Sequence, residues 1–155
     1  MINSSGSRPD AKAYPTLVRV AMALQDTEDQ EFAFTLTSPR PELVEAGLPP
    51  RIRLAGIRQP VLIMFQLTGT FAEGSGARFP PDPHDAAWFG PGEALPQGPG
   101  TAAGMFKPLA VSADGKELLI FAVNAGDGGT YRARFQFGST LSAAAKSGGP
   151  IIIND

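Results

Sequence analysis

The stretch KELLIFAVNAGDGGTYRARFQF, from Lys116 to Phe137, combines an apolar segment, a short polar connection and a strictly alternating segment. From Tyr131 to Phe137 every second residue is an apolar or aromatic one, and Arg132, Arg134 and Gln136 lie between them. A period of two places one set on a buried face and the other set in solvent. The stretch therefore predicts β-strands at the centre of an all-β protein.

The first half of the stretch, residues 118–123, is apolar on both faces of its predicted strand. This pattern fits a strand that is covered on both sides, or one whose outer face meets something else. The connection that follows, residues 124–129, contains three glycines together with Asn124 and Asp127, which tolerate positive φ. A helix through this connection is excluded.

Alternate positions across this connection carry Asp127, Gly129, Tyr131 and Ala133. The pattern resembles the Asp-x-Gly-x-Tyr-x-Cys signature of immunoglobulin-type domains, with Ala133 at the cysteine position. In that family the tyrosine lies at the corner between two strands, and its hydroxyl bonds to backbone a few residues upstream. The resemblance implies a sandwich without the inter-sheet disulfide. The alternative is a glycine-rich hairpin turn with a tyrosine in the core.

The composition bounds the class of protein. A chain of 155 residues with 43% hydrophobic residues is long enough for one domain with its own core. Its 18 glycines and 15 prolines indicate many turns and argue against a helical bundle. The absence of cysteine excludes disulfides, thiol catalysis and cysteine-bound metals. A net charge of −2 does not favour a nucleic-acid partner.

The N-terminal residues 1–14 are polar, and we expect a flexible lead-in without the apolar region of a signal peptide. The longest apolar run, Val61 to Phe65, is far too short to span a membrane. These observations predict a soluble, cytoplasmic protein that does not bind membranes, although they do not exclude export.

Further strands are predicted from alternation or from apolar runs, at residues 16–24, 31–37, 51–57, 61–67, 105–111 and 150–155. The strand at 61–67 is the most apolar and is expected at the centre of its sheet, whereas Pro108 points to an edge strand. Short helical segments are expected at 42–46 and 139–146. The predicted fold is an all-β, immunoglobulin-like antiparallel β-sandwich of seven to eight strands, formed by residues 15–155, with a long Pro/Gly-rich loop inserted at 69–104.

The C-terminal part carries a second resemblance. A strand ending in Phe135-Gln136-Phe137, then a short connection and the closing sequence PIIIN at 150–154, resembles the C-terminal half of the DP-EP family of small uncharacterised bacterial proteins. The similarity spans roughly residues 112–154, and it departs at the Asp-Pro dipeptide, which here is Gly149-Pro150. The resemblance implies a small β-sandwich and no known activity.

The loop at 69–104 is where a site is expected, because structureless loops of this length are usually functional or disordered. The only histidine, His84, lies between Asp82 and Asp85. These three side chains could hold a hard metal ion, although the rigid prolines around them oppose convergence on one ion. A hydrolase would use His84 as a base with Ser75 as nucleophile, but Ser75 lacks the sequence of a nucleophile elbow. The simplest interpretation is a solvated His84, with Trp88 anchoring the loop on the sandwich.

A binding surface is the remaining interpretation of this loop. Trp88, Phe89, Phe79 and Phe71 could line an aromatic surface for a ligand or for another subunit. Two groups of charged residues lie outside this loop. The acidic turn at residues 26–31 lacks the spacing of a calcium-binding loop, so a solvated turn is expected. Arginines at 51, 53, 132 and 134 would form a basic stripe if their two strands were neighbours, but ordinary solvated faces are expected.

The sequence alone identifies no specific activity. The leading hypothesis is a non-enzymatic structural or protein-interaction module that binds another protein or a second copy of itself. We expect no catalytic residue, no metal and no cofactor. The alternative is a ligand-binding or hydrolytic protein with its site in the 69–104 loop, for which the candidate ligand-binding residues are His84, Trp88, Phe89, Asp82 and Asp85.

Overall fold

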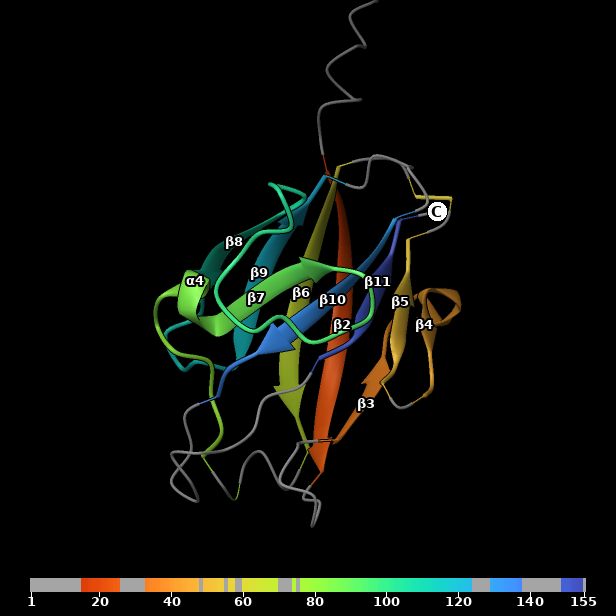
Figure 1. Ribbon diagram of the computed structural model, residues 1–155. Coiled ribbons are helices and arrows are strands. Elements are labelled where there is room, and N and C mark those ends of the chain that lie inside the picture. The colour runs from red at the N-terminus through yellow and green to blue at the C-terminus, as the bar shows by residue number, and fades with distance from the viewer. Residues whose placement is uncertain are drawn as a thin grey trace, which may run out of the picture.

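The computed structural model describes residues 15–25, 33–47, 49–54, 56–57, 60–69, 74, 76–123, 129–137 and 149–154. These residues form two five-stranded sheets that lie on one another as two layers (Figure 1). The all-β prediction is confirmed. The elements are β2 (Thr16–Gln25), β3 (Ala33–Thr37), the 3-10 helix η1 (Pro41–Leu43), β4 (Val44–Glu45), β5 (Arg51–Arg53), β6 (Val61–Thr68), α4 (Pro83–Ala86), β7 (Ala87–Pro91), β8 (Phe106–Val111), β9 (Glu117–Ala122), β10 (Thr130–Phe135) and β11 (Ile151–Ile153).

Sheet 1 has the strand order β3-β2-β6-β9-β8. The most apolar strand, β6, lies at its centre, as its sequence predicts. The edge strand β8 contains Pro108, and its pairing with β9 shifts by one residue between Pro108 and Ala110. A sheet tolerates proline at a bulge on an edge strand, because the N–H that proline lacks would have no neighbouring strand to donate to there. The predicted edge position is therefore also confirmed.

Sheet 2 has the strand order β4-β5-β11-β10-β7. Its middle strand is the short C-terminal β11, which pairs with β10 on one side and with β5 on the other. The carbonyl of Pro150 accepts a hydrogen bond of 3.0 Å from the backbone N–H of Ala133. A Cβ atom on Gly149 would collide with the backbone carbonyl of Ala133. The entry into β11 thus leaves no room for a side chain at position 149.

Two features of the predicted sandwich are wrong. The sheets are mixed rather than antiparallel, because β2 pairs in parallel with β6 and β11 pairs in parallel with β5. Alternation does not encode the direction of a neighbouring strand. Direction is set by the connections, and between β3 and β6 the chain leaves sheet 1 to form β4 and β5 in sheet 2. The described strands also exceed the seven to eight predicted, since β4 and β7 were not expected.

The segment at 69–104 is not a plain loop. It contains α4 and then β7, which pairs antiparallel with β10 from Tyr131↔Pro91 to Phe135↔Ala87. β7 is the last strand in the order of sheet 2, and on its other side Phe89 forms an isolated bridge with Thr101. Proline and glycine dominate the sequence around β7 and interrupt the alternation by which a strand of this length is predicted.

The stretch from Lys116 to Phe137 forms β9 and β10, which belong to different sheets and do not pair with each other. The connection at 124–128 lies outside the described residues, as do Phe71, Ser75, the acidic turn and the expected helix at 139–146. The hydrogen bond of the immunoglobulin-type tyrosine corner remains a prediction. The expected helical turn near 42 is a 3-10 helix, η1, that begins with Pro41 and leads directly into β4.

The inner faces of both sheets share one core. The ring centres of Phe65 on β6 and Phe135 on β10 are 4.8 Å apart, and Phe79 lies 5.8 Å from Phe135. On the side of β7 and β8, Phe89 and Phe106 stack with their centres 4.6 Å apart. Of the alternating residues predicted to face inward, Val18, Val20, Met22, Ala133, Phe135 and Phe137 are buried, whereas Leu36 and Tyr131 are only partly buried.

Candidate functional site

The predicted site residues around His84 lie on and beside the short helix α4. Asp82 is the N-cap of this helix, and its Oδ1 accepts a hydrogen bond of 2.9 Å from the backbone N–H of His84. The same oxygen lies 3.4 Å from Nδ1 of His84, whose side chain is 68% exposed. An N-cap carboxylate satisfies a backbone donor that the helix itself leaves free. This geometry gives Asp82 a structural role at the start of α4.

The three candidate metal ligands do not form a site in the structure. Asp82, His84 and Asp85 are all exposed, and no group of three or more His, Cys, Asp or Glu residues among those described could hold a metal ion. Ser75, the nucleophile considered for a hydrolase, lies outside the described residues. The arrangement at α4 matches the interpretation of His84 as a solvated residue.

The neighbours Trp88 and Phe89 point to opposite faces of sheet 2. Phe89 is 2% exposed and stacks on Phe106 in the core, and Phe79 is also buried. Trp88 lies on the outer face, where the guanidinium of Arg134 is 5.6 Å from its ring centre. Alternation along β7 separates these rings, so Trp88, Phe89 and Phe79 do not line one aromatic surface.

The arginines of β10 hold a Pro/Gly-rich segment against the outer face of sheet 2. Nη1 of Arg132 donates to the carbonyl of Glu93 at 2.7 Å, and Nη1 of Arg134 donates to the carbonyl of Pro96 at 3.1 Å. Arg51 on β5 lies 3.7 Å from the carboxylate of Glu93. Figure 1 shows the chain after β7 crossing in front of β10. We call residues 92–100 the strap.

The strap also explains the arginine pattern seen in the sequence. Strands β5 and β10 are not neighbours, because β11 lies between them, and Ile151 is paired with Arg132 on one side and with Arg51 on the other. Ile151 and Ile153 are only 1% and 6% exposed. The arginines are therefore not a free basic stripe. Arg132, Arg134 and Arg51 bind the strap and help to cover the isoleucines of β11, whereas Arg53 pairs with Glu45 on β4.

A hollow of about 550 Å³ lies between residues 78–81 of the 69–104 segment and the turn from β8 to β9. Its lining residues are Arg78, Phe79, Pro80, Pro81, Val111, Ser112, Ala113 and Gly115. None of the five predicted site residues belongs to this lining. The hydroxyl of Ser112 donates to Oδ1 of Asp114 at 2.6 Å, so it is engaged in the turn.

The turn beside this hollow is built by side chains. Oδ1 of Asp114 also accepts from the backbone N–H of Lys116 at 2.9 Å, and Oγ of Ser112 accepts from the N–H of Glu117 at 3.0 Å. The hydrogen bond from Ser112, followed by that from Lys116, lowers the pKa of Asp114 below its ordinary value. The carboxylate therefore stabilises the turn in its ionised form.

The outer face of sheet 1 differs from that of sheet 2. The pairing register aligns Leu17, Leu62 and Phe121 in one row across β2, β6 and β9, and Met64 with Leu119 in the next row. Their neighbours along each strand point into the core, so these side chains point outward. Leu17 is 43% exposed, and Leu109 on the bulged edge strand is 48% exposed. We define the sheet 1 face as Leu17, Arg19, Leu62, Met64, Gln66, Lys107, Glu117, Leu119 and Phe121.

Charges border this apolar face. Arg19 lies beside Met64 in the register, Lys107 lies opposite Phe121, and Glu117 lies opposite Gln66. Nζ of Lys107 is 5.9 Å from the centre of the Phe121 ring, which holds the ammonium group over the aromatic edge of the face. Neither Arg19, Lys107 nor Glu117 forms an ion pair with a residue in the described part of the chain.

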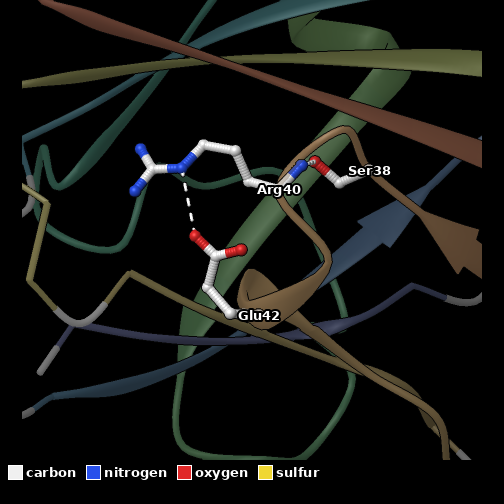
Figure 2. Close-up of polar contacts among 3 residues, drawn as sticks. All are labelled: Ser38, Arg40 and Glu42. Atoms are coloured by element: carbon white, nitrogen blue, oxygen red, sulfur yellow. Dashed lines mark hydrogen bonds and ion pairs between the residues drawn. The ribbon is translucent and has the colours of Figure 1, made fainter.

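An ordinary solvated ion pair lies between β3 and β4 (Figure 2). Nε of Arg40 lies 3.2 Å from the carboxylate of Glu42, and the backbone N–H of Arg40 donates to Oγ of Ser38. Both charged side chains are exposed, and such pairs contribute little to stability. Arg40 and Glu42 are therefore suitable positions for control substitutions.

No protein-family model matches this chain, and the comparison with curated proteins finds no match. No residue role is therefore transferred from a relative. No helix among the described residues is both long and apolar enough to cross a membrane. The only sequence signal for the sheet 1 face is the doubly apolar stretch 118–123, which fits either a strand covered on both sides or one whose outer face meets something else.

Proposed function

We propose that this protein is a non-enzymatic β-sandwich module of the immunoglobulin-like type, and that it acts by binding another protein surface. The observation that carries the proposal is the sheet 1 face, an outward-facing set of leucines, a methionine and a phenylalanine on three neighbouring strands. Contiguous apolar surface of this kind is uncommon on soluble monomers and marks interaction sites.

The contrast between the two sheets supports this choice. The outer face of sheet 2 carries apolar residues of β11, and the strap and its arginine partners cover that sheet. The chain thus protects one outer face with its own segments. On sheet 1, Leu17 is exposed and Leu62, Met64, Leu119 and Phe121 are half-buried, so part of this apolar surface meets solvent. A second protein would supply the cover that the strap supplies to sheet 2.

Site-specific photo-cross-linking tests the proposal. A photoreactive phenylalanine analogue is placed at Met64, at the centre of the sheet 1 face, and in a matched variant at the exposed Glu42 (Figure 2). Both proteins are produced in cells, irradiated there and analysed by mass spectrometry. We expect a discrete cross-linked species from position 64 and none from position 42.

Two controls make the result decisive. Circular dichroism and thermal unfolding establish that both variants fold as the unmodified protein does. The interaction role is rejected if positions 64 and 62 give no cross-linked species in folded protein. It is also rejected if they give the same non-specific distribution of products as position 42.

A further inference from the structure

We infer that the partner on the sheet 1 face is a second copy of this chain, related by a two-fold axis near Leu119 that sets Lys107 of each copy against the partner's Glu117. This inference rests on the proposed function, because it names the occupant of the same face. It is carried by the placement of opposite charges around the apolar rows.

The two charges lie at opposite ends of the face. Glu117, Leu119 and Phe121 are the outward residues of β9, two positions apart. Lys107 on the neighbouring β8 is paired with Phe121. Glu117 therefore lies two residues to one side of Leu119, and Lys107 lies at the level two residues to the other side.

A two-fold axis that passes near Leu119 and runs across the strands exchanges these two ends. Each Lys107 then meets the partner's Glu117, and the interface contains this pair twice, as an isologous interface requires. Leu62, Met64, Leu119 and Phe121 are enclosed between the two charged pairs. The same rotation carries Arg19 over aliphatic side chains of the partner and away from the partner's own Arg19.

The geometry agrees with how sheets pack. One strand spacing of about 4.8 Å and four residues of about 3.4 Å each separate Lys107 from Glu117, so their connecting line is inclined by roughly 20° to the strands. A two-fold axis perpendicular to this line makes the strands of the two copies cross at roughly 40°. Face-to-face sheets in sandwiches cross at about 30°, and side chains at such an angle can interdigitate.

The mixed signs on the face favour a second copy over an unrelated charged partner. An acidic partner would satisfy Arg19 and Lys107, but it would place a like charge over Glu117. A basic partner would face the reverse conflict. A second copy places Lys107 and Glu117 in complementary positions, and like-charge contacts disfavour the other partners.

The area of the face sets the expected affinity. Four strands and about six residues along each give roughly 400 Å² of sheet per copy, by the standard strand dimensions. Stable interfaces bury about 800 Å² per partner, so this interface belongs among the weak and transient ones. We expect a dimer with a dissociation constant in the micromolar range.

Variants with exchanged charges, measured by analytical ultracentrifugation, test the inference. Lys107→Glu and Glu117→Lys are each expected to weaken dimerisation about tenfold or more, because each places like charges together twice. The double variant, Lys107→Glu with Glu117→Lys, restores the opposite pairs and is expected to dimerise like the unmodified protein. An equimolar mixture of the two single variants is also expected to form a heterodimer, since each copy then supplies the charge that the other lacks.

Arg40→Glu is the matched control, because it makes the same change of charge at the exposed pair in the β3–β4 connection. It should leave the dimerisation constant unchanged. A protein that stays monomeric up to about 1 mM, well above the expected dissociation constant, overturns the inference. So does a double variant that is as weak as the single variants.

These outcomes are separable from failure of the proposed function. A cross-link from position 64 to a different protein, together with a monomer in the ultracentrifuge, retains the interaction role and rejects the second copy as its partner. Absence of any cross-link rejects both.

Discussion

The guanidinium of Arg134 lies over the indole ring of Trp88, with its central carbon 5.6 Å from the ring centre. Nη1 of the same arginine donates to the carbonyl of Pro96 at 3.1 Å. Trp88 precedes the strap and Pro96 lies within it. One side chain on β10 therefore fixes two points of the Pro/Gly-rich segment against sheet 2.

Replacing Arg134 by alanine should release the strap while the sheets remain. We expect hydrogen exchange of the amides in residues 92–100 to accelerate, because the strap is no longer held against sheet 2. The free energy of unfolding should fall by about 1–2 kcal/mol, the contribution of a cation–π contact and a charge-assisted hydrogen bond at a half-buried site. Exchange measured by mass spectrometry and chemical denaturation check both effects.

Arg40→Ala is the control for this substitution, since it also removes one guanidinium but from an exposed pair. Its effect on stability should stay within about 0.5 kcal/mol. Unchanged exchange across 92–100 in Arg134→Ala would show that the strap is held without this arginine.

Asp82 and His84 should differ sharply when they are replaced. Asp82→Ala removes the N-cap of α4 and should cost about 0.5–2 kcal/mol of stability, whereas Asp82→Asn should retain most of it. His84→Ala should change stability by less than about 0.5 kcal/mol, because its side chain is exposed. Equilibrium denaturation in urea gives all three values. A larger loss from His84→Ala than from Asp82→Ala would contradict the assignment of these roles.

Periodicity predicted the strands well where one face is buried and the other is not. The alternation in β2 and β10 identified Val18, Val20, Ala133 and Phe135 as inward residues, and all four are buried. The edge position of β8 followed from Pro108 alone. Each of these conclusions depends on local chemistry, namely the period of a strand or the missing N–H of proline.

Periodicity could predict neither the relative direction of paired strands nor the existence of strand β7. Parallel pairing of β2 with β6 depends on the path of the intervening chain, and no residue pattern within either strand records it. In β7, Gly90 and Pro91 break the pattern after Trp88 and Phe89, and the strand is fixed by long-range pairing with β10. Tertiary contacts thus decide what local sequence leaves open.

The ligand-binding role predicted for His84, Trp88, Phe89, Asp82 and Asp85 stays a prediction. The chemically distinctive residues His84 and Trp88 suggested a site, but in the structure Asp82 caps α4 by accepting from the backbone N–H of His84, and Trp88 contacts Arg134. The sheet 1 face consists of ordinary leucines and a methionine. Its signal in the sequence was the doubly apolar run at 118–123, which becomes informative only when the register aligns it with Leu62 and Met64.

Alanine substitutions at Gly115 and Gly56 should separate backbone strain from steric collision. Both have positive φ, 74° and 73°, but a Cβ on Gly115 would lie 2.7 Å from Cβ of Arg78, whereas a Cβ on Gly56 has no neighbour within 4 Å. Gly56→Ala should therefore cost about 1–2 kcal/mol for backbone strain alone. Gly115→Ala should cost at least about 1 kcal/mol more, because the turn must move away from Arg78. Urea denaturation of both variants measures the difference, and equal losses would exclude a steric contribution.

The turn at Asp114 should weaken in acid. Its hydrogen bonds to Ser112 and Lys116 hold the pKa of the carboxyl below its ordinary value in the folded protein. A folded pKa below the unfolded one means that the ionised group stabilises the fold above the unfolded pKa, and that this contribution is lost as the pH falls through the folded pKa. Carbon-detected NMR titration should give a midpoint for Asp114 below the ordinary range of aspartate, and Ser112→Ala should raise it because the strongest of these hydrogen bonds is removed. The amides of Lys116 and Glu117 should lose protection over the same pH interval. A midpoint that does not respond to Ser112→Ala would mean that the hydroxyl does not stabilise the carboxylate.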